Sequence, residues 1–73
     1  MYAVSIRSHL KEYRVQAGLT RRQLGDMVGI SFETIKAYED KGAVPSLRVA
    51  FKLAHILQCD VEDLFEPNIT KLQ

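Results

Sequence analysis

Residues 20–41, TRRQLGDMVGISFETIKAYEDK, contain two groups of apolar side chains at helical spacing. The first group has the i, i+3, i+4 spacing of one helical face. The two groups are Leu24, Met27 and Val28, and Ile35 and Tyr38. Gly29 stands between them and can take the positive φ that ends a helix. The segment therefore predicts two helices joined by a tight turn. Each has only about two to three turns and must pack against the rest of the chain to be stable.

Capping residues stand where these two helices would begin. Thr20 and Gln23 have the spacing of a capping box, in which each side chain accepts a hydrogen bond from the backbone of the other residue. Ser31 is a suitable N-cap for the second helix. These local signals place the start of the first helix after Thr20 and the start of the second after Ser31.

The composition limits the fold to one small domain. A chain of 73 residues forms a single domain and buries only about 60% of its unfolded surface. Its hydrophobic content of 47% is enough for one helical core, and its one cysteine excludes a disulfide framework. No apolar run approaches ~18 residues, and the N-terminus lacks the features of a signal peptide. We therefore expect a cytoplasmic protein that has no membrane segment.

Charge is distributed unevenly along the chain. The formal net charge is only +1, whereas dedicated nucleic-acid binders are often strongly basic. Residues 1–52 carry nine Lys/Arg and five Asp/Glu, a net charge of +4, and residues 53–73 carry one Lys and four Asp/Glu, a net charge of −3. This asymmetry could orient the molecule on a polyanion, although a solvated surface with chance clustering gives the same pattern.

A further helix is predicted before residue 20. Its apolar residues are spaced 4, 3 and 4 apart. They are Ile6, Leu10, Tyr13 and Ala17. Ser5 suits the N-terminal end of this helix and Gly18 its C-terminal end. Residues 2–6 are the only part of the chain with any strand character, and we expect the four residues before Ser5 to fray or to pack on a partner.

A fourth helix is predicted to begin at Pro45 and Ser46. One broad face of this helix is apolar. It consists of Leu47, Ala50, Phe51, Leu53, Ala54 and Leu57. Val49 and Ile56 are expected on the far side, where they would be ordinary exposed residues or part of a subunit contact.

The last predicted helix covers residues 61–65, with Asp60 as its cap and Pro67 as the residue that stops it. In the tail that follows, Ile69 and Leu72 have no predicted partner. The sequence as a whole predicts an all-α fold, a compact bundle of five short helices. Its core is expected at about residues 5–66 and its tail at 67–73.

These features together resemble the helix-turn-helix of phage-repressor DNA-binding domains, the Cro/cI or XRE-like family. The resemblance extends from about Ile6 to Phe65 and rests on many positions rather than on one motif. Besides the apolar positions, it includes Gly18-Leu19-Thr20, Gly25, Gly29, Glu39, Pro45-Ser46 and Asp63-Leu64-Phe65. Just after the second motif helix the chain departs from the pattern, because it has Lys41 where the family usually has Gly.

The resemblance has structural and functional implications. It implies a lambda-repressor-like domain in which two backbones approach closely at Gly25 and Arg14 forms an ion pair with Glu39. In the family, the second motif helix enters the major groove of double-stranded DNA. The matching DNA-binding positions here are Arg21, Arg22, Ser31, Phe32, Glu33, Lys36, Ala37, Lys41 and Gly42.

The side chains at these positions suggest which part of DNA each would contact. Phe32 and Ala37 could contact thymine methyl groups, and Glu33 could accept a hydrogen bond from cytosine. Arg21 matches a phosphate-contacting position. Asp40 places a second carboxylate on this face, and Lys36 or Lys41 could neutralise it.

Family members commonly bind near-palindromic sites as twofold dimers, which implies a small transcriptional regulator, a repressor, that acts as a homodimer. The residues left without another role suggest the subunit contact. They are Val49, Ile56, Leu64, Phe65 and Ile69.

The main alternative is a protein-interaction module that retains the fold, such as an antirepressor or accessory subunit. The near-neutral charge and the carboxylates of Glu33 and Asp40 favour it. No catalytic arrangement is evident, so we do not expect an enzyme. His55 and Cys59 are four residues apart, but two ligands do not make a closed zinc site. We expect no metal, cofactor or small-molecule ligand.

Overall fold

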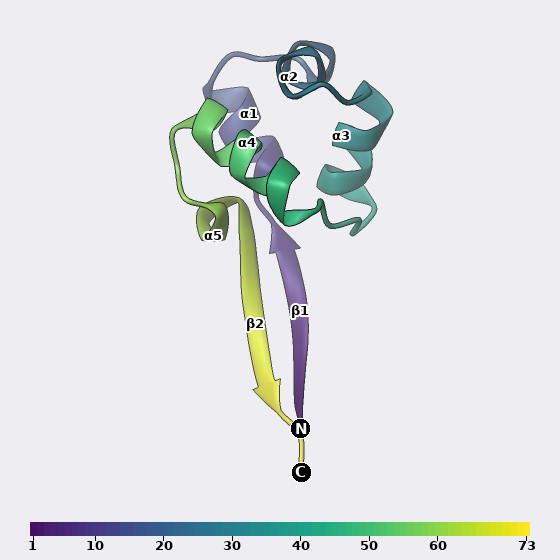
Figure 1. Cartoon of the computed structure of the whole chain (residues 1–73), viewed down its shortest axis with the longest axis vertical. Helices are drawn as coiled ribbons and strands as arrows, with labels where there is room; N and C mark the ends of the chain where they lie inside the picture. The colour runs from purple at the N-terminus through teal and green to yellow at the C-terminus, as the bar shows by residue number, and fades with distance from the viewer.

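The computed structural model describes all 73 residues and has two parts (Figure 1). Five helices form a head, and two strands project from it as an arm, with both chain ends at the far tip (Figure 1). The arm gives the molecule an elongated shape of 44 × 22 × 20 Å. The elements are β1 (Tyr2–Ser8), α1 (Leu10–Gln16), α2 (Arg21–Val28), α3 (Phe32–Asp40), α4 (Leu47–Leu57), α5 (Val61–Leu64) and β2 (Phe65–Lys71).

The helix-turn-helix of α2 and α3 confirms the local predictions. Thr20 and Gln23 form the capping box, with the Thr20 hydroxyl accepting from the Gln23 N–H at 3.0 Å and the Gln23 side chain accepting from the Thr20 N–H at 2.9 Å. Gly29 ends α2 with φ of 91°, and Ser31 caps α3 by accepting from the Thr34 N–H. A side chain at Gly25 would meet the carbonyl oxygen of Ile30 at 2.5 Å, so α2 and the turn touch backbone to backbone.

The core of the head lies between the helices and is apolar. Its ten buried members are Leu10, Leu24, Val28, Ile35, Ala50, Leu53, Ala54, Leu57, Leu64 and Phe65. Three residues predicted on inner faces, Met27, Leu47 and Phe51, are instead more than half exposed. Val49 and Ile56 were predicted on the far side of α4 but pack partly against the core. The buried stripe of α4 is therefore rotated toward their side of the helix.

The first helix is shorter than the periodicity predicted. It begins at Leu10 with His9 at the N-cap position, whereas Ser5 and Ile6 lie in β1. The prediction of a helix from Ser5 was wrong because the i, i+4 spacing of Ile6 and Leu10 also suits a strand that leads into a helix. Gly18 follows the helix with φ of 72°, as expected for a helix end.

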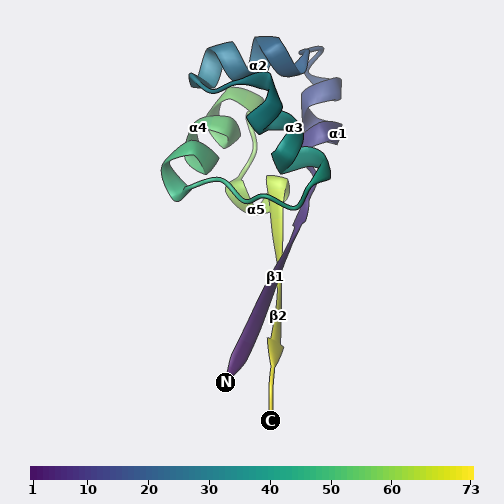
Figure 2. The ribbon, with the colours of Figure 1, turned by 90° about the vertical axis from the view of Figure 1, so that its right-hand side faces the viewer.

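The chain is not purely all-α, because its two ends form an antiparallel two-stranded sheet. Tyr2 pairs with Lys71 at the tip, and Ser8 pairs with Phe65 at the base. The two strands cross in the side view with the twist usual for such ribbons (Figure 2). The segment predicted as a tail therefore forms most of β2, and Phe65 begins this strand instead of ending α5.

The chain contains no helix with the length and apolar character required to cross a bilayer.

Candidate nucleic-acid interface

The outer face of α3 is available for contact. Ile35 is fully buried, and Tyr38 is half-buried in an edge-to-face contact with Phe65, with ring centroids 6.5 Å apart. These two contacts fix the rotation of α3 about its axis. The exposed residues at the start of α3 and along its outer face are Ser31, Phe32, Glu33, Lys36 and Asp40, and Ala37 is half-buried among them.

An ion-pair network fixes the end of α3 to α1 and α2. The Glu39 carboxylate, fully buried, accepts from Arg14 Nε at 2.6 Å and from Arg21 Nε at 2.9 Å. Arg14 also donates to the carbonyl oxygen of Leu19 at 2.8 Å. The structure thus contains the Arg14–Glu39 pair that the resemblance implied, and it adds Arg21. Because Glu39 and Arg14 are both satisfied, neither carries an unpaired buried charge.

Asp40 is neutralised by Arg21 and not by Lys36 or Lys41. Arg21 Nη2 donates to the Asp40 carboxylate at 3.2 Å, while its Nε binds Glu39. No sequence spacing indicated this contact, because it joins the first residue of α2 to the last residue of α3. It has two consequences. Asp40 no longer opposes a polyanion with a free charge, and Arg21 keeps only part of its donor capacity for a phosphate.

A second contact not foreseen from the sequence holds Arg22 at the start of α3. The Arg22 guanidinium lies 5.0 Å from the centre of the Phe32 ring, within the range of a cation–π interaction. Both side chains are exposed. The contact places a positive charge beside the N-terminus of α3 and joins a residue predicted to bind phosphate to one predicted to contact a base.

The loop after α3 resolves the departure from the family pattern at Lys41. Lys41 takes the C-cap position, and Gly42 supplies the positive φ, 72°, one residue later. The Ala43 N–H then donates to the carbonyl oxygen of Ala37 at 3.3 Å, which also accepts from the Lys41 N–H, so the turn after Gly42 folds back onto the last turn of α3. Lys41 and Gly42 are both exposed, as are Lys36 and Arg22.

The predicted subunit contact is mostly not available. Leu64 is fully buried and Phe65 is 6% exposed, because both belong to the core of the head. Val49 and Ile56 are partly covered by the same core. Of the five residues predicted, only Ile69 is largely exposed, at 62%, and it lies on the arm. The prediction was wrong for Leu64 and Phe65 because both side chains pack into the core of the head and are not left over at the surface.

The environment of Cys59 lowers its reactivity. Burial and the nearby carboxylates of Asp63 and Asp60 raise the pKa of the Cys59 thiol above its ordinary value. The same burial and Asp63 raise the pKa of the Tyr13 hydroxyl. Because the thiolate is the form that acts as a nucleophile or metal ligand, this position favours a structural role for Cys59.

Comparison with known proteins agrees with this geometry. Residues 10–64 match the family model described as helix-turn-helix, so the chain belongs to that family. It is 38% identical over 60 residues to an uncharacterized HTH-type transcriptional regulator of Archaeoglobus fulgidus, covering 82% of this chain and 86% of that protein. A protein of the same description from Methanocaldococcus jannaschii is also 38% identical, and one from Bacillus subtilis, YgzD, is 33% identical; the matches cover 82% of this chain and 91% of each relative.

Proposed function

We propose that this chain is a transcriptional regulator that binds double-stranded DNA by inserting α3 into the major groove. The observation that carries the proposal is the anchoring of α3. Its inner side is buried and its end is fixed by Glu39, while its outer side is exposed. A helix held in this way fits the major groove, where base edges can be distinguished. Membership of the helix-turn-helix family and the names of the relatives support a DNA-binding regulator rather than an enzyme.

The proposed contacts divide into those that recognise bases and those that bind phosphates. Phe32, Glu33 and Ala37 meet base edges, with Glu33 accepting from a cytosine amine. Arg22, Lys36 and Lys41 bind phosphates, together with the backbone at Gly42. Ser31 and the free donors of Arg21 complete the set. Each good base contact is expected to discriminate by about 1–3 kcal/mol.

We further propose that the protein is a repressor that binds a near-palindromic site as a homodimer. One head offers few phosphate contacts, so a single copy is expected to bind weakly and with strong salt dependence. Two copies related by a twofold axis can place their α3 helices about 34 Å apart, in successive major grooves on one side of the duplex. The weakness of one head therefore supports a dimer.

The test is binding to a random-sequence duplex pool, measured by fluorescence anisotropy at two salt concentrations, with sequencing of the bound fraction. Affinity is expected to fall steeply as salt rises. Arg22→Ala combined with Lys36→Ala should abolish binding. Lys11→Ala, at an exposed position of α1, removes one charge outside the proposed contact set and should have little effect. Enrichment of a symmetric site supports the dimer, and absence of binding at low salt would reject DNA binding.

A protein-interaction module is the second candidate. Glu33 favours it, because this exposed carboxylate takes part in no ion pair with Lys36 or Arg22 and would oppose a phosphate backbone. The salt dependence of binding and the double substitution distinguish the two functions. A largely apolar protein contact would survive high salt and the double substitution at Arg22 and Lys36, whereas a DNA complex would not.

A further inference from the structure

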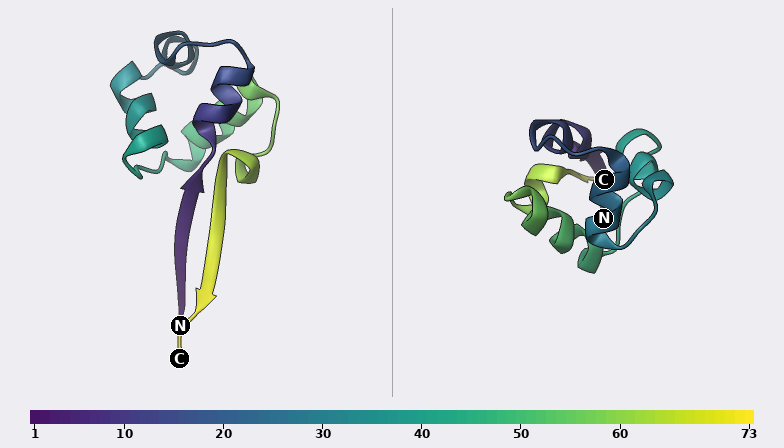
Figure 3. Two further views of the ribbon diagram at one scale, coloured as in Figure 1. Left: turned by 180° about the vertical axis from the view of Figure 1, so that it is seen from behind. Right: turned by 90° about the horizontal axis from the view of Figure 1, so that it is seen from above.

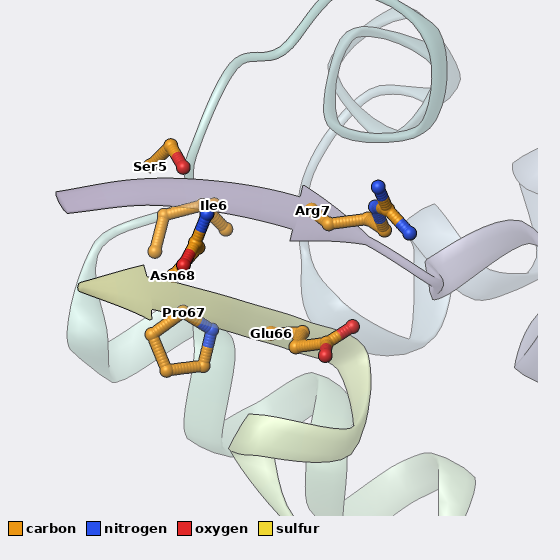
Figure 4. A pocket seen from close by; sticks show the side chains of 6 residues that line it. All are labelled: Ser5, Ile6, Arg7, Glu66, Pro67 and Asn68. Carbon is orange, nitrogen blue, oxygen red and sulfur yellow. The ribbon is translucent and has the colours of Figure 1, made fainter. Parts of the chain in front are cut away.

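The arm has one apolar face and one polar face. Residues paired across the two strands share a face, and successive residues alternate between faces. The pairs on the apolar face are Tyr2–Lys71, Val4–Ile69, Ile6–Pro67 and Ser8–Phe65. The pairs on the polar face are Ala3–Thr70, Ser5–Asn68 and Arg7–Glu66. Figure 4 shows part of both sets, with Arg7 and Glu66 nearest to the helices.

Most of the apolar face is uncovered. Its inner end is Phe65, which is 6% exposed in the core of the head. Farther out, Ile6 is 37% exposed, Val4 60% and Ile69 62%. No helix lies alongside the arm in the views from the front, the side and behind (Figures 1, 2 and 3). Because an isolated two-stranded sheet is marginal in water, an uncovered apolar face of this kind calls for a partner.

The hydrogen-bond pattern disfavours contact through the outer edge of β2. The His9 N–H donates to the Leu64 carbonyl at 2.7 Å. His9 and Leu64, which follow the Ser8–Phe65 pair on the side of the head, are therefore a hydrogen-bonded pair. Pairs alternate in an antiparallel ladder, which makes Ile6–Pro67 a non-hydrogen-bonded pair. The N–H that Pro67 lacks would therefore point to the outer edge of β2, and its absence weakens the addition of another strand there.

We infer that the apolar face of the arm packs against the same face of a second copy of this chain in a twofold dimer. The inference rests on the proposed function, which requires two α3 helices on one duplex. A twofold axis places a patch against itself, so the patch must be complementary to its own copy. The middle of this face carries no charged side chain, so nothing there requires a partner of opposite charge. It consists of Val4, Ile6, Pro67 and Ile69.

The size of the face indicates how tight this dimer is. Seven residues per strand at roughly 3.3 Å each give an arm about 23 Å long. Its exposed apolar side chains present on the order of 400 Å² per copy, about half of the roughly 800 Å² per partner found in stable complexes. The dimer is therefore weak in the free protein, and binding of two copies to adjacent half-sites strengthens it through effective concentration.

The test compares two neighbouring residues of β2 that face opposite ways. Ile69→Glu places a carboxylate on the apolar face, and Thr70→Glu places the same charge on the polar face. Sedimentation equilibrium without DNA, from low to high micromolar protein, gives the dimer dissociation constant. Wild type and Thr70→Glu should dimerise alike, and Ile69→Glu should raise the constant by at least about tenfold, because burial of a charge opposes association.

Several results would overturn the inference. One is a wild-type protein that stays monomeric at high micromolar concentration without DNA, which would leave the face to a lipid or another protein. Another is equal dimerisation of both variants. Circular dichroism melting shows whether the head remains folded, and Val4→Glu against Ser5→Glu repeats the comparison on β1. The masses are measured without DNA, and Ile69→Glu should still bind a single half-site, so failure of the dimer and failure of DNA binding are separable.

Discussion

At Glu39, one carboxylate joins three helices. It belongs to α3 and accepts hydrogen bonds from Arg14 of α1 and Arg21 of α2. Its side chain is completely buried, and Arg14 is only 9% exposed. Such a network gives little net stability compared with an apolar replacement, but removal of one member leaves the others buried without their counter-charge. Glu39 is therefore the residue through which the end of α3 is held to both α1 and α2.

We predict that Glu39→Ala destabilises the protein by about 3–5 kcal/mol, enough to unfold most of a domain of this size. Urea denaturation followed by circular dichroism measures the change. Asp40→Ala is the matched control, since it removes an exposed carboxylate that also binds Arg21, and it should cost less than about 1 kcal/mol. A melting temperature for Glu39→Ala within a few degrees of wild type would contradict the prediction.

Gln58, at the end of α4, is the only residue other than glycine with a positive φ, at 56°. An L side chain in this region is disfavoured by roughly 1–2 kcal/mol, whereas glycine adopts it freely but loses more chain entropy on folding. We predict that Gln58→Gly stabilises the domain by about 0.5–1 kcal/mol, the difference between the strain relieved and the extra chain entropy lost. Gln58→Ala keeps the strain and should not do so. Thermal melts of wild type and both variants test this prediction. A lower melting midpoint for Gln58→Gly than for wild type would contradict it.

At the scale of elements, α2 and the turn before α3 meet at Gly25. A Cβ there would lie 2.5 Å from a backbone carbonyl oxygen, which no side-chain rotation can relieve. We predict that Gly25→Ala destabilises the domain by about 1–3 kcal/mol, although alanine favours helix formation. The neighbouring exposed residue provides the control, since Asp26→Ala should be nearly neutral. A denaturation midpoint for Gly25→Ala equal to that of wild type would show that the two backbones can separate without loss.

The arm is tied to the head by His9 and Glu66, whose side chains are 2.8 Å apart and 57 residues apart in sequence. The hydrogen bond from His9 lowers the pKa of the Glu66 carboxyl below its ordinary value of 4.5, with the charges of His9 and Arg7 adding to the effect against a smaller desolvation. Since the folded pKa is the lower one, ionised Glu66 stabilises the folded state above the unfolded pKa. This contribution is lost as the pH falls through the folded pKa.

Glu66→Gln should therefore make stability less dependent on pH below 4.5, while it lowers stability at neutral pH. His9→Ala should flatten the acid dependence in the same way, because it removes the donor. Thermal melts between neutral pH and pH 3 compare both variants with wild type. If either variant retained the full acid sensitivity of wild type, the hydrogen bond would not be its source.

At the scale of the whole molecule, the sequence alone predicted those features whose interacting residues lie close together in the chain. The capping box of Thr20 and Gln23, the Ser31 cap and the Gly29 turn each involve groups within a few residues, and all are present. The Arg14–Glu39 pair joins distant positions and was accessible only through the family resemblance. The contacts of Arg21 with Glu39 and Asp40 depend on how helix ends meet in space, and no spacing in the sequence specifies them.

The arm was missed for a related reason. Residues 2–6 had some strand character, but a strand is stable only beside a partner, and the partner lies at the other end of the chain. No strand was predicted around Ile69 because Pro67, which usually marks the end of an element, stands just before it. The place of Pro67 in a non-hydrogen-bonded pair explains why the strand continues through this residue.

Because the first and last elements of the chain pair with each other, the order of folding follows from the connectivity. Pairing of β1 with β2 closes a loop that contains every helix, which carries a large entropy cost until the head has formed. The strands can then pair in sequence, starting at Ser8 and Phe65, next to the core, and ending at Tyr2 and Lys71. Among the amides that are hydrogen-bonded across the ladder, exchange should therefore be slowest at Arg7 and Glu66, near the base of the arm, and become faster at each following hydrogen-bonded pair toward the chain ends. The arm would be the last part of the protein to form and the first to open.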